Sequence, residues 1–234
     1  MSAFQTTRWS QVMAAGSSDT AARQALESLC RAYRGPVLGF VRHLGHPPSE
    51  AEDLTQQFFV HFIEHRVHAA ADRERGRFRA LLRSALRNFL IEQHEHAHAA
   101  KRGGGRVLEA IDESHERILA GDGRDAPDRV FDRAWAATLI DRAAERMRRD
   151  AMRAGKGALF DRLREFLLEA PQSDDYAQVA LELAVRPNQL AVTVHRMRAK
   201  LRDCLRAELL ETVDSPEGLR EELESLREVL SSAG

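Results

Sequence analysis

The chain has 234 residues, and its net charge of −1 and apolar content of 43% are ordinary for a folded globular protein. It contains no apolar run near the roughly 20 residues that span a bilayer, and its first residues lack the basic and apolar segments of a signal peptide. The two cysteines, Cys30 and Cys204, form no zinc or disulfide pattern, so we expect a cytoplasmic protein without a metal or other cofactor.

The composition of the whole chain favours helices over strands, because Ala, Leu, Arg and Glu are abundant and β-branched residues are few. Apolar residues recur at helical spacing over 26–44, where Gly35-Pro36 is expected to kink or divide the helix. A second helix is expected over 49–65, beginning with a capping box, and a third over 77–101.

The second half separates into a linker and further helices. Periodicity is weak from 105 to about 127, where Gly and Asp are frequent, and we expect an interdomain linker over 105–130. Further helices are expected over 131–153, 156–169, 174–184, 188–210 and 217–230. We therefore expect an all-α protein with two small helical domains joined by a linker and helical extensions at both ends.

Basic charge is concentrated in one of these helices. From Arg186 to Arg206, six Lys or Arg residues stand against one acid, which gives a net charge of +5. The helix 188–210 follows 174–184 after a short turn, as in a helix-turn-helix, whose second helix enters the major groove of DNA. The alternative is an ordinary amphipathic helix pair with a solvated basic face.

The helix expected over 49–65 separates polar from apolar residues. Its polar face holds Glu52, Asp53, Gln56, Gln57 and Glu64. Such a face offers carboxylates to a basic partner, although an ordinary solvated helix face has the same pattern.

Three motifs occur in the order found in one known family. The sequence Glu-Ala-Glu-Asp-Leu-Thr-Gln at 50–56 resembles the D-A-E-D-L-x-Q signature of the extracytoplasmic-function (ECF) group of bacterial RNA polymerase sigma factors, in the sigma-70 family. Residues 78–90 resemble the next pattern of that group, in which a hydrophobic helix leads to Arg-Asn. The segments 183–185 and 194–198 resemble its last domain.

The resemblance implies a sigma factor that binds the RNA polymerase core, through its β′ and β subunits, and directs it to promoter DNA. It divides the chain into an N-terminal extension, a domain for the core and the −10 element, a linker, a helix-turn-helix domain for the −35 element, and an acidic tail. The corresponding ranges are 1–24, 25–104, 105–130, 131–211 and 212–234. The linker is expected to thread toward the active-site cleft of the polymerase.

Individual residues receive roles from the resemblance and from the faces of the helices. The clamp helices of the polymerase are expected to meet Glu52, Asp53 and Gln56. The −10 element, as it melts, is expected to meet Arg83, Arg87, Asn88, Gln93 and His94. The −35 element is expected to meet Asn188, Gln189, Thr193, Arg196, Arg198 and Lys200.

Other functions receive less support. No catalytic triad or paired-carboxylate cleft is recognised, so no enzyme is expected, and His94 and His98 lack a third ligand for a metal. An anti-sigma factor or a Ser/Thr kinase stays open as a partner; Thr55 is a candidate phosphosite, but a partly buried helix threonine is the simpler interpretation. A free-standing helix-turn-helix regulator and a helical interaction adaptor also stay open.

The C-terminal segment is acidic and amphipathic. Residues 207–234 hold eight acids against two arginines, a net charge of −6. A narrow leucine stripe that needs a docking surface is formed by Leu219, Leu223, Leu226 and Leu230. We expect it to pack on the second domain or between the domains, where it either mimics DNA phosphate or only covers apolar surface. As a mimic of DNA phosphate, the tail carboxylates would lie near Arg196, Arg198, Lys200 or Arg202.

Overall fold

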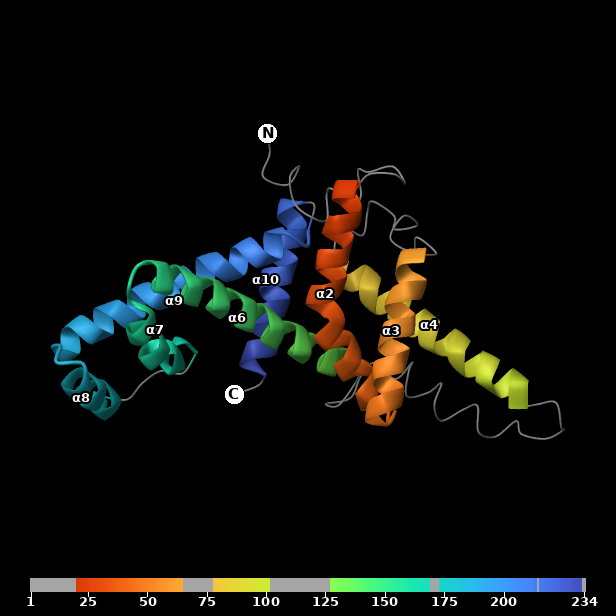
Figure 1. Ribbon diagram of the computed structural model, residues 1–234, viewed down its shortest axis with the longest axis horizontal. Coiled ribbons are helices and arrows are strands. Elements are labelled where there is room, and N and C mark those ends of the chain that lie inside the picture. Colours follow the sequence, from red (N-terminus) through yellow and green to blue (C-terminus); the bar gives the residue numbers. More distant parts are fainter. Residues whose placement is uncertain (1–19, 65–77, 102–126, 169–172, 214, 233–234) are drawn as a thin grey trace. The chain divides into compact units, whose positions relative to one another are not determined.

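The computed structural model describes residues 20–64, 78–101, 127–168, 173–213 and 215–232 (Figure 1). In this part of the chain the regular elements are helices, which confirms the all-α expectation. The proposed extension up to residue 19 and the linker from 105 to 126 lie outside the described residues. The chain divides into two compact units, Met1–Thr138 with Leu210–Gly234, and Leu139–Leu209.

The first unit contains α2 (Thr20–His43), α3 (Pro48–Glu64) and α4 (Phe78–Lys101). The expected α3 and α4 agree with these bounds to within one residue, whereas α2 begins earlier than expected. Of the two effects expected from Gly35-Pro36, a kink or a division of the helix, the division is wrong, because α2 continues through Pro36. Val37 and Phe40 are fully buried, so core packing outweighs the hydrogen bond that proline removes.

The start of α3 also differs from the expected capping box. The helix begins at Pro48, a residue that suits the first helical position because that position needs no N–H donor. Ser49 therefore lies inside the first turn and is not the N-cap residue that the box requires.

Parts of two later elements complete the first unit, namely α6 (Pro127–Arg153) up to Thr138, and α10 (Pro216–Ser231). The helix expected over 131–153 begins four residues earlier, because Pro127 favours the first helical position. The α10 helix begins at a true cap, since the Ser215 hydroxyl accepts a hydrogen bond from the N–H of Gly218 at 3.1 Å.

Aromatic side chains form much of the core of the first unit. The ring of Tyr33 on α2 meets Phe78 of α4 edge-on at 5.1 Å between centroids, and it stacks on Phe131 of α6 at 6.5 Å. Phe58 of α3 lies 5.7 Å from Phe89 of α4. Such pairs add about 0.5–1.5 kcal/mol each beyond the burial of their area. The core therefore holds the beginning of α6 against the helices that precede it.

The second unit is built from the later part of α6, α7 (Gly157–Leu163), the 3-10 turn η4 (Arg164–Leu167), α8 (Ser173–Glu182) and α9 (Pro187–Leu210). The helix expected over 156–169 is shorter, because the chain tightens into η4. The helix pair expected at 174–184 and 188–210 is confirmed by α8 and α9. Its core is a cluster of buried apolar residues, namely Leu163, Phe166, Val179, Ala180, Leu190 and Val194.

The turn between α8 and α9 contains a strained residue. Ala184 has a φ of 51°, a left-handed conformation that costs an L-residue with a Cβ atom roughly 1–2 kcal/mol. The turn is closed by a hydrogen bond of 2.9 Å from the N–H of Val185 to the carbonyl of Ala180.

Replacing Ala184 with glycine is therefore expected to stabilise the chain by about 0.5–1 kcal/mol, because glycine adopts a positive φ without a steric penalty. Urea unfolding of the full chain measures the change. Ala177→Gly, at an exposed position within α8, is the matched control and should destabilise by about 1 kcal/mol. A loss of stability in Ala184→Gly would contradict the left-handed turn.

Candidate functional site

The polar face of α3 holds the residues that sequence reasoning assigned to a polymerase contact. One of them, Glu52, is engaged within the chain: its carboxylate pairs with Arg34 and lies 3.5 Å from Nη2 of Arg42, both on α2. Asp53 and Gln56 are exposed. Asp53 and Gln56 are therefore accessible to a partner. Glu52 would first have to break its ion pairs with Arg34 and Arg42.

Thr55 and Cys30 lie in the core of the first unit. Thr55 is fully buried on the apolar face of α3, so a kinase could reach its hydroxyl only if α3 left the core. Burial raises the pKa of the Cys30 thiol to about 12, which keeps this cysteine protonated and unreactive at neutral pH.

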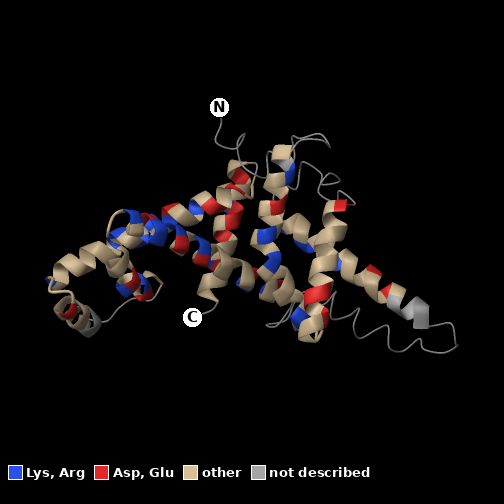
Figure 2. Ribbon diagram, viewed as in Figure 1, with Lys and Arg blue, Asp and Glu red and all other residues tan. Residues whose placement is uncertain are grey.

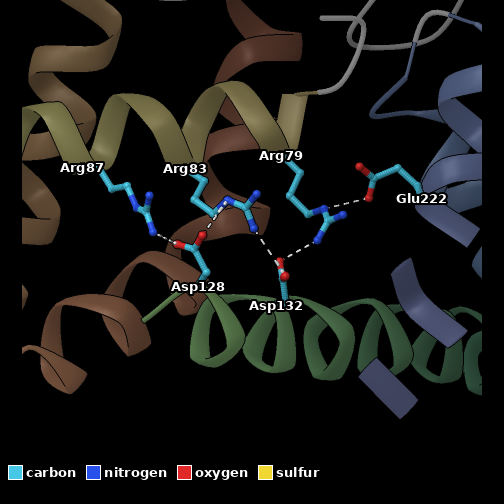
Figure 3. Close-up of polar contacts among 6 residues, drawn as sticks. All are labelled: Arg79, Arg83, Arg87, Asp128, Asp132 and Glu222. Carbon is cyan, nitrogen blue, oxygen red and sulfur yellow. Dashed lines mark hydrogen bonds and ion pairs between the residues drawn. The ribbon is translucent and has the colours of Figure 1, made fainter. Parts of the chain in front are cut away.

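One side of α4 presents a row of three arginines, Arg79, Arg83 and Arg87, which we call the arginine row. Figure 3 shows that its members point at carboxylates of α6 and α10. Nη2 of Arg87 lies 2.9 Å from Oδ1 of Asp128, and Nε of Arg83 lies 3.7 Å from Oδ2 of the same aspartate. Nη1 of Arg83 lies 3.4 Å from Oδ2 of Asp132. Two arginines assigned to the −10 element are thus paired within the first unit.

The third member of the row is buried. The Arg79 side chain is 7% exposed, and its Nη1 lies 2.5 Å from Oδ1 of Asp132 while its Nε lies 2.8 Å from Oε2 of Glu222. Its guanidinium carbon lies 4.1 Å from the centroid of the Trp135 ring, a cation–π contact. Burial by itself would lower the pKa of Arg79, but the two carboxylates outweigh this effect and raise it. Arg79 is therefore a structural cation.

The tail helix was expected to bring its carboxylates near the basic residues of α9, and for Glu222 this is wrong. Glu222 is 1% exposed and pairs with Arg79. Leu219 and Leu226 are buried beside it, whereas Leu230 is exposed. At 100° per residue, Glu222 borders the leucine stripe, so packing of the stripe carries its carboxylate into the core, where it needs a cation.

The remaining residues assigned to the −10 element lie elsewhere on α4. Asn88 is exposed and lies about 100° further around the helix than Arg87. Gln93 and His94 are half-buried. The five assigned residues are therefore not equivalent, because two are held in ion pairs and Asn88 faces solvent.

Figure 2 marks the Lys and Arg residues of α9, and the burial of its side chains gives this helix a buried and an exposed face. Leu190, Val194 and Leu201 point into the second unit. The opposite face is exposed and contains Asn188, Gln189, Val192, His195 and Arg196. Val192 and His195 were missed by sequence reasoning, although the phase of the buried residues places them on this face. Apolar and polar groups together on such a face suit base edges in the major groove.

The other three residues assigned to the −35 element make contacts within the second unit. The Thr193 hydroxyl donates to the carbonyl of Gln189 at 2.8 Å, and Nε of Arg198 donates to the carbonyl of Phe166 at 2.9 Å. Nζ of Lys200 lies 2.7 Å from Oδ2 of Asp150. The hydrogen bond from Lys200, and after it the one from Arg153, lowers the pKa of Asp150 to about 2.

The described residues contain no group of three or more His, Cys, Asp or Glu side chains arranged to hold a metal ion. None of the described helices is both long enough and apolar enough to span a membrane.

A family match covers α3, α4 and the part of α2 from residue 29 onward. Residues 29–102 match the family model of Sigma-70 region 2. This match supports a sigma-70 family sigma factor, and it does not extend to the second unit. No curated protein and no solved structure matches the chain.

Sigma-70 region 2 takes part in binding the RNA polymerase core and in promoter melting, a role in transcription initiation that is not enzymatic. The polar face of α3 and the arginine row of α4 both lie inside the segment that matches region 2. The three acids that pair with the arginine row all lie outside the segment that matches region 2. They are Asp128, Asp132 and Glu222.

Proposed function

We propose that the chain is a cytoplasmic ECF-type sigma factor that binds the RNA polymerase core, through β′ and β, and directs it to promoters. The observation that carries the proposal is the match of residues 29–102 to Sigma-70 region 2. The helix pair α8 and α9 supports it, because two helices joined by a short turn, the second of them basic, follow residues 29–102 in the order that a −35 domain requires.

In this proposal each exposed face has its own partner. Asp53 and Gln56 on α3 contact the polymerase clamp, with Glu52 joining once it leaves its arginines. Asn88, Gln93 and His94 on α4 meet the melted −10 element. The −35 element is read by the exposed face of α9, and the residues on that face are Asn188, Gln189, Val192, His195 and Arg196.

Two measurements on the full chain test the proposal, namely co-purification with core RNA polymerase and run-off transcription from genomic fragments with that core. We expect a stable complex and transcripts that start at discrete sites. Failure of both overturns the proposal. Specific binding to duplex DNA without any binding to core would favour the second candidate, a free-standing helix-turn-helix regulator, which the α8–α9 pair also supports.

The orientation of α9 gives a matched pair of variants. Arg196 and Lys200 each contribute one positive charge, but Arg196 lies on the exposed face and Lys200 pairs with Asp150. Arg196→Gln should weaken binding to promoter duplex and reduce the slope of log K against log salt by about 0.9, the value for one phosphate contact. Lys200→Gln should change both quantities much less.

Fluorescence anisotropy of a labelled duplex at several salt concentrations measures both variants. Equal losses, or a larger loss for Lys200→Gln, would contradict the proposed orientation of α9.

A further inference from the structure

The arginine row forms ion pairs with carboxylates of the same chain. At its outer end, formed by Arg83 and Arg87, another anion could replace the carboxylate of Asp128. We propose that Asp128 is an intramolecular latch, which occupies the position of a DNA phosphate between Arg83 and Arg87 and has to leave before promoter DNA can bind there. The proposal rests on the proposed function, since it assumes that this side of α4 meets DNA.

The geometry of Asp128 is that of a bridging anion. Its Oδ1 contacts Arg87 and its Oδ2 contacts Arg83, so one carboxylate joins two guanidinium groups that lie one helical turn apart (Figure 3). Guanidinium groups bind carboxylates and phosphates through the same N–H donors. A DNA phosphate entering this side of α4 therefore competes directly with Asp128.

Charge balance weakens the attraction of the row for polyanions while its ion pairs persist. Its three arginines face three carboxylates, those of Asp128, Asp132 and Glu222. The row is therefore close to neutral while these contacts persist. Loss of one carboxylate exposes a net positive charge at the outer end of the row, which strengthens attraction to DNA phosphate.

The inner end of the row, at Arg79, is more deeply buried than the outer end, at Arg83 and Arg87. Arg79 and Glu222 are almost inaccessible, and Asp132 pairs with Arg79 as well as with Arg83, so these residues belong to the core. At the outer end Arg83 is 31% exposed, Arg87 26% and Asp128 22%. Nη2 of Arg87 and Oδ1 of Asp128 are buried but form no hydrogen bond among the described residues, so releasing this carboxylate breaks an ion pair and no hydrogen bond. Asp128 can therefore be released without unfolding the inner pair.

Removing the carboxylate of Asp128 tests the latch in the full chain. Asp128→Asn should bind a labelled single-stranded oligonucleotide about two- to fivefold more tightly at low salt, the range that a partly exposed ion pair is worth. The gain should shrink as salt screens the phosphates. Asp128→Ser, which also removes the charge, should show the same gain, and circular dichroism checks that both variants fold.

Two controls make the result specific. Glu224→Gln, at an exposed position of α10, removes the same charge from the same unit and should leave the affinity unchanged. In an Arg83→Gln, Arg87→Gln background, Asp128→Asn should give no gain. An unchanged affinity in folded Asp128→Asn, an equal gain in Glu224→Gln, or a gain that survives loss of both arginines would each overturn the latch.

Run-off transcription with core polymerase separates the latch from the proposed function. Tighter oligonucleotide binding with neither core binding nor transcription would leave the latch standing and reject the sigma-factor proposal. Transcription by the unaltered chain, without tighter oligonucleotide binding in Asp128→Asn, would support the sigma-factor proposal and reject the latch.

Discussion

Replacing Glu222 with alanine is expected to lower the free energy of unfolding by about 3 kcal/mol, at the lower end of the range for breaking a buried ion pair. The change leaves Arg79 charged and buried against Trp135, with Asp132 as its remaining carboxylate partner. That remaining partner is the reason for choosing the lower end of the range. Urea unfolding measures the effect, and a Trp9→Phe background leaves Trp135 as the sole fluorescent tryptophan.

Two comparisons isolate the ion pair. Glu224→Ala removes an exposed acid from the same helix and should change stability by no more than about 0.5 kcal/mol. The double variant Arg79→Met with Glu222→Leu should be more stable than either single variant, because neither buried charge is left unpaired. If Glu222→Ala unfolds like Glu224→Ala, the tail helix does not hold Arg79 as described.

Asp53→Lys is expected to weaken binding to core RNA polymerase about tenfold or more, because a like-charge contact in an interface costs several kcal/mol. Asp53 is exposed on α3, so the substitution should leave the stability of the chain within about 0.5 kcal/mol of its original value. Competition between the variant and the unaltered chain for core polymerase measures the loss.

The choice of Asp53 over Glu52 follows from the structure. Glu52→Lys would place a third positive charge beside Arg34 and Arg42, and a loss of binding could then reflect a disturbed α2–α3 contact. Glu224→Lys is the control for a general charge effect, since it makes the same change on α10. Normal affinity of Asp53→Lys for core would remove α3 from the proposed interface.

Local patterns were enough to predict most of the helices. Apolar residues at three- and four-residue spacing report which face of a helix is buried, and this spacing located α3, α4 and α9 to within a residue. The same spacing also distinguishes the exposed residues of α9 from those close to its buried face. On α9 it separates the exposed Val192 and His195 from Arg198, which lies close to the buried face and bonds to η4.

The partners of charged residues could not be predicted in this way. Arg83 and Asp132 are 49 residues apart in sequence, and nothing in either local pattern indicates that they meet. Both arginines at the outer end of the row looked available for DNA because periodicity shows only that they avoid the apolar face. Glu222 is an intermediate case, since its place at the border of a leucine stripe indicates burial but does not identify the cation.

The route of the chain through the first unit sets an order for folding during synthesis. This unit combines α2, α3 and α4 with α10, so its packing is incomplete until residues 216–231 have left the ribosome. Residues 139–209 form the second unit without any interruption and can fold before that point. During synthesis the later unit can therefore be folded while Arg79 of the earlier one still lacks Glu222.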